Sequence, residues 1–231
     1  MAIDCYLAMT AAEIASAPSL PRKLGYMACH FSPYSTGLSN LPRQLPPDSL
    51  LLLTDRTPIC GHDPELIARQ LSDCAKANHC RGILLDFQRA ECAETARLVQ
   101  HLASALPCPM AVSHLYAGQS DCPVLLPPVP PDTLPADHLA PWQGREIWLE
   151  ASLDSLCITV TPKGTRFSPA GSDNEPLPHR DDRLHCHYRT EVSPEEVVFI
   201  LRRTPEDLAS LLEEAEALGV SLTVGLYQEL G

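Results

Sequence analysis

Short apolar runs that favour β structure recur eight times along this chain of 231 residues, and helical patterns separate several of them. Strands that alternate with crossover helices pair in parallel, and eight of them in a chain of this length predict a closed (β/α)8 barrel of the TIM type. The eight expected strands are Ile3–Met9, Leu24–Phe31, Ser49–Asp55, Gly82–Gln88, Met110–Tyr116, Pro123–Val129, Glu146–Ala151 and Leu222–Tyr227.

Local patterns predict where several helices begin and end. Thr10–Glu13 has the capping-box pattern, and Asp63–Glu65 and Thr204–Asp207 each place a capping side chain before a proline. Gly219 suits the end of the last helix. Seven prolines between residues 122 and 142 are too many for a regular helix, so we expect an irregular crossover there.

The period of the pattern changes between residues 155 and 202. Cys157–Thr161 and Thr165–Phe167 flank a Pro-Lys-Gly turn and predict a hairpin, while Val197–Leu201 fits a strand or a helix. We therefore expect a small β insertion, at about residues 155–202, between strands seven and eight of a single barrel domain that covers residues 1–231. The sequence ends soon after strand eight, so the helix that usually closes such a barrel is not expected.

Composition and charge narrow the classes of partner and compartment. The net charge is −12 and the pI is about 5.1, so we expect neither nucleic acid nor an anionic membrane surface as a partner. The ten cysteines are spread singly, without a CxxC pair, and the first residues lack a basic stretch followed by an apolar core. Reduced thiols and a cytoplasmic location are the expectation.

The sequence of the fourth expected strand resembles a motif of a known protein family. Gly82-Ile83-Leu84-Leu85-Asp86-Phe87-Gln88 resembles the fourth-strand motif D-G-x-D-x-D-x-E of family 18 glycoside hydrolases, the chitinase-like barrels that include spore-cortex peptidoglycan hydrolases. The ending, Gly219 to Gly231, resembles the G-x-x-x-W-E-L-G strand of the same family. The resemblance covers the layout of the whole chain, but only these short stretches in motif.

The sequence departs from the family pattern at the positions that carry the family's catalytic residues. Strand alternation places Leu84, Asp86 and Gln88 on one face. The resemblance implies a glutamic acid at position 88 that protonates the leaving oxygen, and a glutamine cannot do so. Leu84 removes a further carboxylate, Gln228 stands where the family has a tryptophan, and the M-Y-D motif of strand six is not visible in residues 124–128. The resemblance therefore implies a barrel that has lost the family's hydrolysis, with Asp86 as a vestige of the site.

Other chemistries find little support in the sequence. None of the three lysines lies at the C-terminal end of an expected strand, which disfavours Schiff-base catalysis, and no glycine-rich phosphate loop follows strands seven and eight. His185 and His187 are the best metal candidates, but no second ligand cluster accompanies them, so we expect no metal and no cofactor. Cys29 and His30 point to opposite sides of a strand, which disfavours a thiol nucleophile paired with that histidine.

Barrel active sites lie at the C-terminal ends of the strands, so polar side chains there are the candidates for ligand binding. Each of them has a structural alternative, such as pairing with a neighbouring loop or capping backbone N–H groups. The candidates are His30, Asp55, Asp86, Gln88, His114, Tyr116, Glu150 and Gln228.

Two hypotheses remain open from the sequence. The first is a non-hydrolytic barrel with a vestigial pocket that binds a small polar or carbohydrate-like ligand or a protein partner. The second is a glycosidase-like enzyme that uses Asp55, Asp86 or Glu150 as a relocated acid or base on a small substrate. Two carboxyl groups facing one cavity, one of them with a raised pKa, would favour the second hypothesis, and a filled barrel mouth would favour the first. Aromatic residues make up only 5% of the chain, too few for a long polysaccharide cleft.

The outer face of strand eight gives one expectation about assembly. Leu222, Val224 and Leu226 alternate with Thr223, Gly225 and Tyr227, so that either outward set looks substantially apolar and in need of cover. We expect a homodimer packed on that side, with an interface above about 1,000 Å2.

Overall fold

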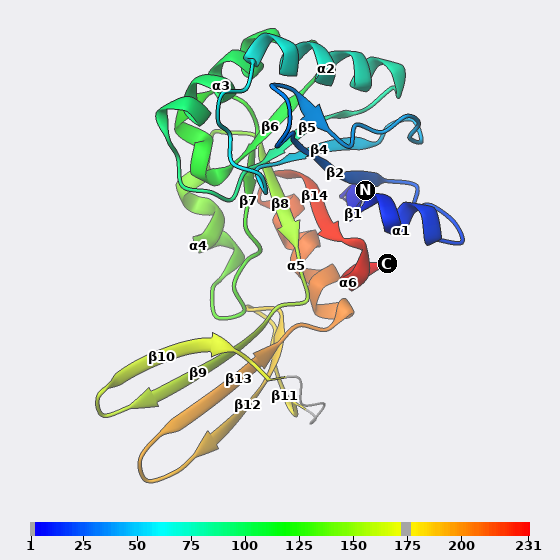
Figure 1. Cartoon of the computed structure of the whole chain (residues 1–231). Helices are drawn as coiled ribbons and strands as arrows, with labels where there is room; N and C mark the ends of the chain where they lie inside the picture. The colour runs from blue at the N-terminus through cyan, green and yellow to red at the C-terminus, as the bar shows by residue number, and fades with distance from the viewer. Residues whose placement is uncertain (1–2, 172–176) are drawn as a thin grey trace.

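The computed structural model describes residues 3–171 and 177–231 and contains the expected TIM-like barrel (Figure 1). Eight parallel strands follow one another around the ring, and the last pairs with the first. In ring order they are β1 (Cys5–Met9), β2 (Leu24–Phe31), β4 (Leu50–Thr54), β5 (Gly82–Asp86), β6 (Met110–Ser113), β7 (Val124–Leu126), β8 (Ile147–Ala151) and β14 (Val220–Leu226). A short strand, β3 (Leu38–Ser39), pairs antiparallel with β2 outside the ring.

The helices around the barrel are uneven, as the sequence predicts. Two long ones, α2 (Pro64–Ala77) and α3 (Ala93–Ala105), cover one side, and α5 (Pro205–Ala217) precedes the last strand. The proline-rich crossover after β7 contains only α4 (Pro135–Leu139) and a 3-10 turn, η2 (Ala140–Trp142), and a 3-10 helix, η1 (His114–Gln119), follows β6. The remaining helices are short: α1 (Ala11–Ser16) and α6 (Tyr227–Leu230).

The expected helix caps are present. The side chains of Thr10 and Thr204 each accept a hydrogen bond from a backbone N–H three residues on, within complete capping boxes. Asp63 accepts from the backbone N–H groups of Glu65 and Leu66 at the start of α2.

Strand alternation divides the buried side chains between the inside and the outside of the barrel. Leu84 and Trp148 belong to the cluster inside the ring, whereas their neighbours Leu85 and Leu149 pack outward under the helices. Because residues along each strand alternate between these two cores, the inward set of each strand continues into the mouth at the C-terminal ends.

The expected insertion between β8 and β14 is a five-stranded antiparallel sheet, which we call the insertion sheet. In Figure 1 it projects away from the barrel. Its strands are β9 (Ser155–Thr161), β10 (Gly164–Pro169), β11 (His179–Asp181), β12 (Cys186–Val192) and β13 (Val197–Arg202), in the spatial order β10-β9-β13-β12-β11. The segment 197–201, which fits either strand or helix in isolation, is the central strand because β9 and β12 pair with it on both sides.

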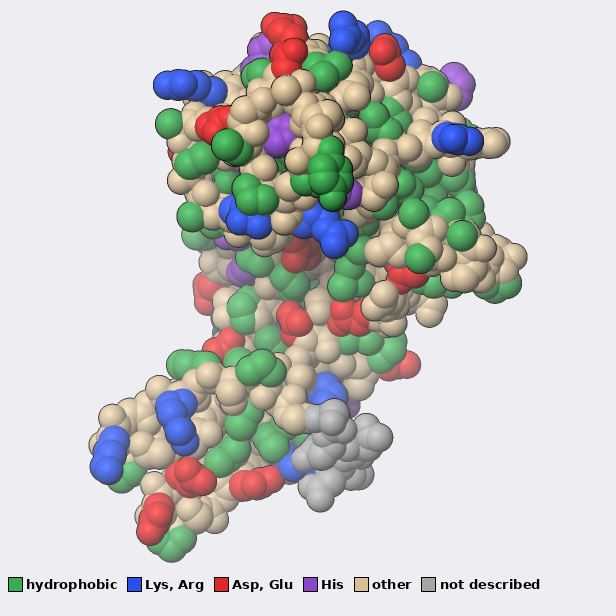
Figure 2. All heavy atoms as spheres, in the orientation of Figure 1, with side chains coloured by type: hydrophobic (Ala, Val, Ile, Leu, Met, Phe, Trp, Pro, Cys, Tyr) green, Lys and Arg blue, Asp and Glu red, His purple; other side chains and the backbone are tan. Residues whose placement is uncertain are grey.

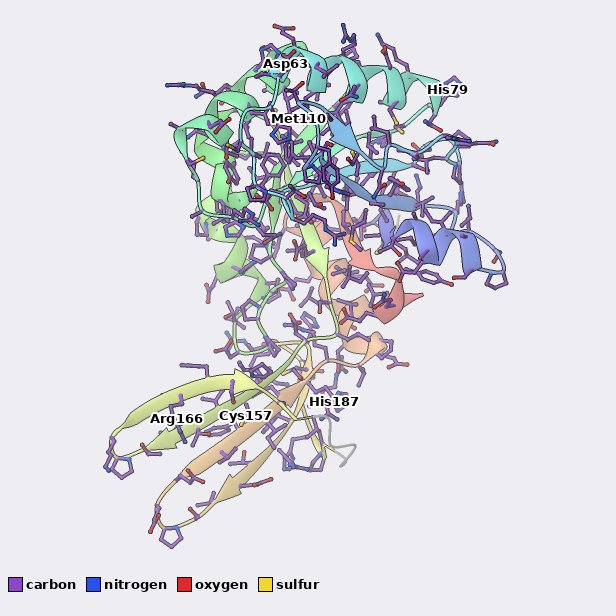
Figure 3. All side chains as sticks on the ribbon, in the orientation of Figure 1. Asp63, His79, Met110, Cys157, Arg166 and His187 are labelled. Atoms are coloured by element: carbon purple, nitrogen blue, oxygen red, sulfur yellow. The ribbon has the colours of Figure 1, made fainter. Side chains whose placement is uncertain are left out.

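Polar side chains, among them the buried Asp207 and His185, join the insertion sheet to the barrel. Figure 3 shows His187 near this junction, and its Nδ1 lies 2.7 Å from Oδ2 of Asp207 in the first turn of α5. Arg180 donates to the other oxygen of the same carboxylate at 3.0 Å. His185 lies before β12, in a left-handed backbone conformation with φ 48°, and its Nε2 is 2.6 Å from Glu214. The two histidines of the metal candidate thus contact two different acids that anchor the sheet.

The outer face of β14 differs from the expectation. Leu222 and Val224 face the barrel interior, whereas Val220 packs outward in the cluster that α5 covers. The other outward residues are Thr223 and Gly225, which are small and buried. Both α5 and α6 contact this strand, and a side chain at Gly225 would collide with Leu230 of α6. The face is therefore neither strongly apolar nor bare.

An apolar groove does remain on the same side of the barrel. It has a volume of about 540 Å3 and lies beside β1 and α5, where Leu7, Leu208 and Leu212 are among its lining residues. The homodimer expected on this side therefore stays a prediction.

Candidate functional site

A cavity of about 250 Å3 opens at the C-terminal ends of the barrel strands. Its floor and much of its wall are apolar, because the inward positions of several strands end here. Its polar groups come from β5, from β8 and the residue that follows it, and from α6. The apolar lining includes Met27, Leu52, Leu84, Leu125, Val224 and Leu226, and the polar lining consists of Asp86, Gln88, Glu150, Ser152 and Glu229.

Asp86 and Gln88 face this cavity from β5 and the residues directly after it. They share the inward face with Leu84, as strand alternation predicts. The amide Nε2 of Gln88 donates a hydrogen bond to Oδ1 of Asp86 at 2.5 Å. Burial raises the pKa of Asp86, the Gln88 hydrogen bond partly offsets that rise, and the negative charge of Asp55 adds to it. Gln88 therefore directs its amide at the one carboxylate that survives from the family motif.

Glu150 enters the same cavity from β8. Burial is the largest cause that raises its pKa to about 7, and the negative charges of Asp86 and Asp154 contribute further. Near neutral pH this carboxyl group populates both its protonated and its ionised form. It can hold or release a proton, which Gln88 cannot do.

Ser152 and Glu229 complete the polar side of the cavity, and the sequence analysis named neither. The Ser152 hydroxyl lies 2.8 Å from Oδ1 of Asp154 and 2.9 Å from Oε1 of Glu229. The backbone N–H of Leu153 also donates to Glu229. Glu229 arrives here because α6 turns back after β14. The signal that could have found it is its place in the family's W-E-L-G ending.

Asp55 and Tyr116 lie next to the site but support the loop that follows β5. The buried carboxylate of Asp55 accepts from the backbone N–H groups of Gln88 at 3.0 Å and Arg89 at 2.8 Å. The Tyr116 hydroxyl donates to the Arg89 carbonyl at 2.9 Å, and its ring packs edge-on against Phe87. Asp55 and Tyr116 therefore hold the backbone at residues 88 and 89 in place, and neither of them lines the cavity.

The other three candidates lie outside the set of described residues that line the cavity. His30 Nδ1 is 3.0 Å from the carbonyl oxygen of Ala28 in its own strand. His114 begins η1, and burial lowers its pKa. Gln228 is exposed on α6 and hydrogen-bonds to Glu13, so the residue at the family's tryptophan position does not contribute to the wall.

Neither a metal site nor a membrane-spanning helix is found in the part of the chain that the structure describes. No three histidine, cysteine or acidic side chains gather closely enough there to hold a metal ion. No helix within residues 3–171 and 177–231 is long and apolar enough to cross a bilayer.

Comparison with known proteins shows that this chain shares its fold with several solved structures. No protein-family model and no curated protein matches the sequence. Among solved structures, the chain is similar to the spore cortex-lytic enzyme SleL of Bacillus cereus, with a TM-score of 0.62 and 11% identity over 99% of this chain and 71% of that one. SleL of Bacillus megaterium QM B1551 gives a TM-score of 0.56 at 10% identity, over 96% and 70% of the two chains.

A plant enzyme has the same fold. A double mutant of the GH18 chitinase from Cycas revoluta, in complex with (GlcNAc)4, matches with a TM-score of 0.58 and 12% identity, over 96% of this chain and 94% of that one. The fold is therefore a TIM barrel like that of family 18 glycoside hydrolases.

Proposed function

We propose that this protein binds a small polar ligand, about the size of one sugar ring, in the barrel mouth and does not cleave glycosides at that site. The observation that carries the proposal is the hydrogen bond from Gln88 to Asp86. An amide has no proton that it can release at useful pH, so the group at the family's proton-donor position binds but does not protonate.

The size and the lining of the cavity support a small ligand. A volume of about 250 Å3 lies below the range of roughly 300–1,000 Å3 that is usual for drug-sized ligands. Its lining residues include no aromatic ring on which a chain of sugars could stack. Carboxylate oxygens and the amide and hydroxyl groups around it favour a ligand that donates hydrogen bonds, such as a hydroxyl-rich or amine-bearing ring.

The structural neighbours favour a sugar-like ligand. Their names describe spore cortex-lytic enzymes and a chitinase, and the chitinase holds (GlcNAc)4 while carrying a glutamate-to-glutamine substitution. We therefore take GlcNAc and its oligomers as the first compounds to test.

One observation favours a second candidate function, an acid–base enzyme in which Glu150 supplies the proton. Asp86 and Glu150 face one cavity, and the pKa of Glu150 is raised to about 7. A protonated Glu150 could donate to a leaving oxygen while an ionised Asp86 stabilises the positive charge that develops on the sugar ring.

Binding and cleavage are measured separately to test the proposal. Calorimetric titration with GlcNAc and (GlcNAc)4 is expected to detect binding by the wild type, and Gln88→Ala is expected to weaken it about tenfold because one hydrogen bond to a charged network is lost. Gln143→Ala, an exposed glutamine outside the cavity, is the matched control and is expected to bind as the wild type does.

The cleavage assay uses the same oligomers and isolated peptidoglycan. No release of reducing ends by the wild type is the expected result. Cleavage by the wild type that is lost in Glu150→Gln and kept in the exposed control Glu213→Gln would be the opposite result. That result would favour the second candidate function, the acid–base enzyme. Absence of both binding and cleavage would contradict both candidates.

A further inference from the structure

One face of the insertion sheet is apolar across all of its long strands. Directly paired residues of an antiparallel sheet project to the same side. The neighbouring strands β9 and β13 therefore each contribute three apolar side chains to one face, and each of the three on β9 is paired directly with one on β13. These six residues are Leu156, Ile158, Val160, Val197, Phe199 and Leu201.

The flanking strands extend the same face. Phe167 of β10 pairs with Ile158, and Tyr188 and Val192 of β12 pair with Leu201 and Val197. We call this surface the apolar face. The opposite side of the sheet is more polar, since Thr159 pairs with Arg166 there and His187 with Arg202. Val198 and Ile200 of β13 are the apolar residues of the central strand on that side.

Next to the barrel, the loop at Pro130–Asp132 lies against this face, and Leu201 is buried there. Toward the free end of the sheet, no second layer covers the face among the residues that the structure describes. The three buried apolar clusters draw none of their members from the insertion sheet. Val192 is 77% exposed, Phe167 62% and Val160 38%. The apolar face of a sheet is normally buried against another layer, and contiguous exposed apolar patches mark interaction sites.

Charge is arranged asymmetrically around the apolar face. The β9–β10 turn carries Lys163, the β12–β13 turn carries Glu195 and Glu196, and the two turns line one cavity at the free end of the sheet. Figure 2 shows hydrophobic side chains on the insertion sheet, with basic side chains on the first hairpin and acidic ones on the second.

We infer that the apolar face is the contact surface for a second copy of this chain, whose own apolar face packs against it to form a two-layer sandwich. Sheets pack in this way about 10 Å apart with their strands nearly aligned. A two-fold axis parallel to the strands, between β9 and β13, superimposes the basic hairpin of one copy on the acidic hairpin of the other. Lys163 of each copy then lies beside Glu195 and Glu196 of the other.

The same axis determines which side chains of the two copies lie over each other. It places Ile158 of one copy over Phe199 of the other, because these residues occupy one level of the sheet on opposite sides of the axis. Phe167 then lies over Thr190, a small side chain on the apolar face between Tyr188 and Val192. A large side chain over a small one, as for Phe167 over Thr190, helps two sheets to interdigitate.

The area of the apolar face lies near the lower limit for a specific dimer. With a strand spacing of about 4.8 Å and a rise of about 3.4 Å per residue, the face measures roughly 20 Å by 22 Å. Two such faces cover about 900 Å2 in flat projection. This value is close to the roughly 1,000 Å2 that marks the lower limit of specific interfaces.

Light scattering and sedimentation of the full chain test the inference. The wild type is expected to be a dimer of 25.2 kDa protomers at about 10 µM. Phe167→Glu is expected to raise the dissociation constant about a hundredfold or more, because it buries an unpaired charge at the interface. Ser168→Glu, one residue away on the polar face, is the matched control and is expected to leave the dimer intact.

Charge reversal tests the orientation of the two copies. Lys163→Glu is expected to weaken the dimer about tenfold, and adding Glu195→Lys and Glu196→Lys to that variant is expected to restore it. Circular dichroism identifies any variant that fails to fold, and Val192→Glu then replaces Phe167→Glu.

Three results would overturn the inference: a monomeric wild type at 100 µM, a dimer indifferent to both Phe167→Glu and Val192→Glu, or a dimer that Leu212→Glu in the groove beside β1 and α5 dissociates instead.

Discussion

The carboxyl group of Glu150 lies at the end of β8, where burial and two neighbouring acids oppose its ionisation. Its pKa of about 7 is well above its ordinary value of 4.5. In the unfolded chain the same group ionises near its ordinary value. The protonated form of Glu150 therefore stabilises the folded state below about pH 4.5, and this contribution is lost as the pH rises through 7.

We predict that this titration is visible in the free energy of unfolding. Between pH 4.5 and pH 8 the wild type is expected to lose on the order of 2 kcal/mol relative to Glu150→Gln, because glutamine resembles the protonated form at every pH. Urea denaturation of both proteins across this range measures the difference. Exposed Glu213→Gln should run parallel to the wild type, and a flat difference for Glu150→Gln would show that Glu150 ionises as freely in the fold as in the unfolded chain.

Among the elements, one buried arginine holds the insertion sheet, the loop after β7 and the start of α5 together. Arg203 directly follows β13, and its guanidinium donates to the carbonyl oxygens of Val129, Pro130, Leu184 and His185. The side chain is 3% exposed. The orientation of the insertion sheet therefore depends on a charge that four carbonyl groups solvate.

We predict that Arg203→Met loosens this junction more than it unfolds the barrel. The carbonyl groups of Val129 and His185 are buried and lose a donor, at a cost of about 1–3 kcal/mol for each group that stays unsatisfied. Limited chymotrypsin digestion is expected to cut within residues 155–202 faster than in the wild type, while the barrel fragment persists. Arg183→Met removes an exposed arginine from the same region and serves as the control. Equal digestion rates for the two variants would show that Arg203 does not hold the insertion sheet in place.

At the scale of the whole molecule, the ten cysteines differ in their exposure to solvent and in the pKa of their thiols. All ten are free thiols in the structure, and their reduced state stays a prediction. Cys60 and Cys92 are exposed, whereas Cys29, Cys74 and Cys186 are buried. Hydrogen bonding from Thr95 lowers the pKa of Cys92, and burial raises the pKa values of the buried three.

We predict two stages in a thiol titration with Ellman's reagent. The folded protein is expected to react first at Cys92, because its lowered pKa favours the reactive thiolate, and then at Cys60. Cys92→Ser should remove the fast phase and Cys60→Ser should not. In denaturant without reductant all ten thiols are expected to react, and a shortfall would reveal disulfides or a bound metal.

The sequence by itself determined the barrel, because its evidence is local. Alternation along single strands, such as Leu84, Asp86 and Gln88, fixes which side chains face the mouth, and capping boxes at Thr10 and Thr204 fix where helices begin. The proline-rich crossover and the hairpin of the insertion follow from the same kind of short-range pattern.

The tertiary structure decided the chemistry of the site, because that depends on contacts between distant segments. Asp55 looked like a ligand contact and instead holds the backbone of residues 88 and 89, 33 and 34 positions along the chain. Glu229 reaches Ser152 across 77 positions. The pKa of Glu150 rises because the closed barrel buries its carboxyl group and brings Asp86 from β5 close to it. The apolar face likewise needs the strand register, since no single strand shows which of its neighbours share its side. Short-range patterns specify elements, while burial and electrostatics arise only when the elements meet.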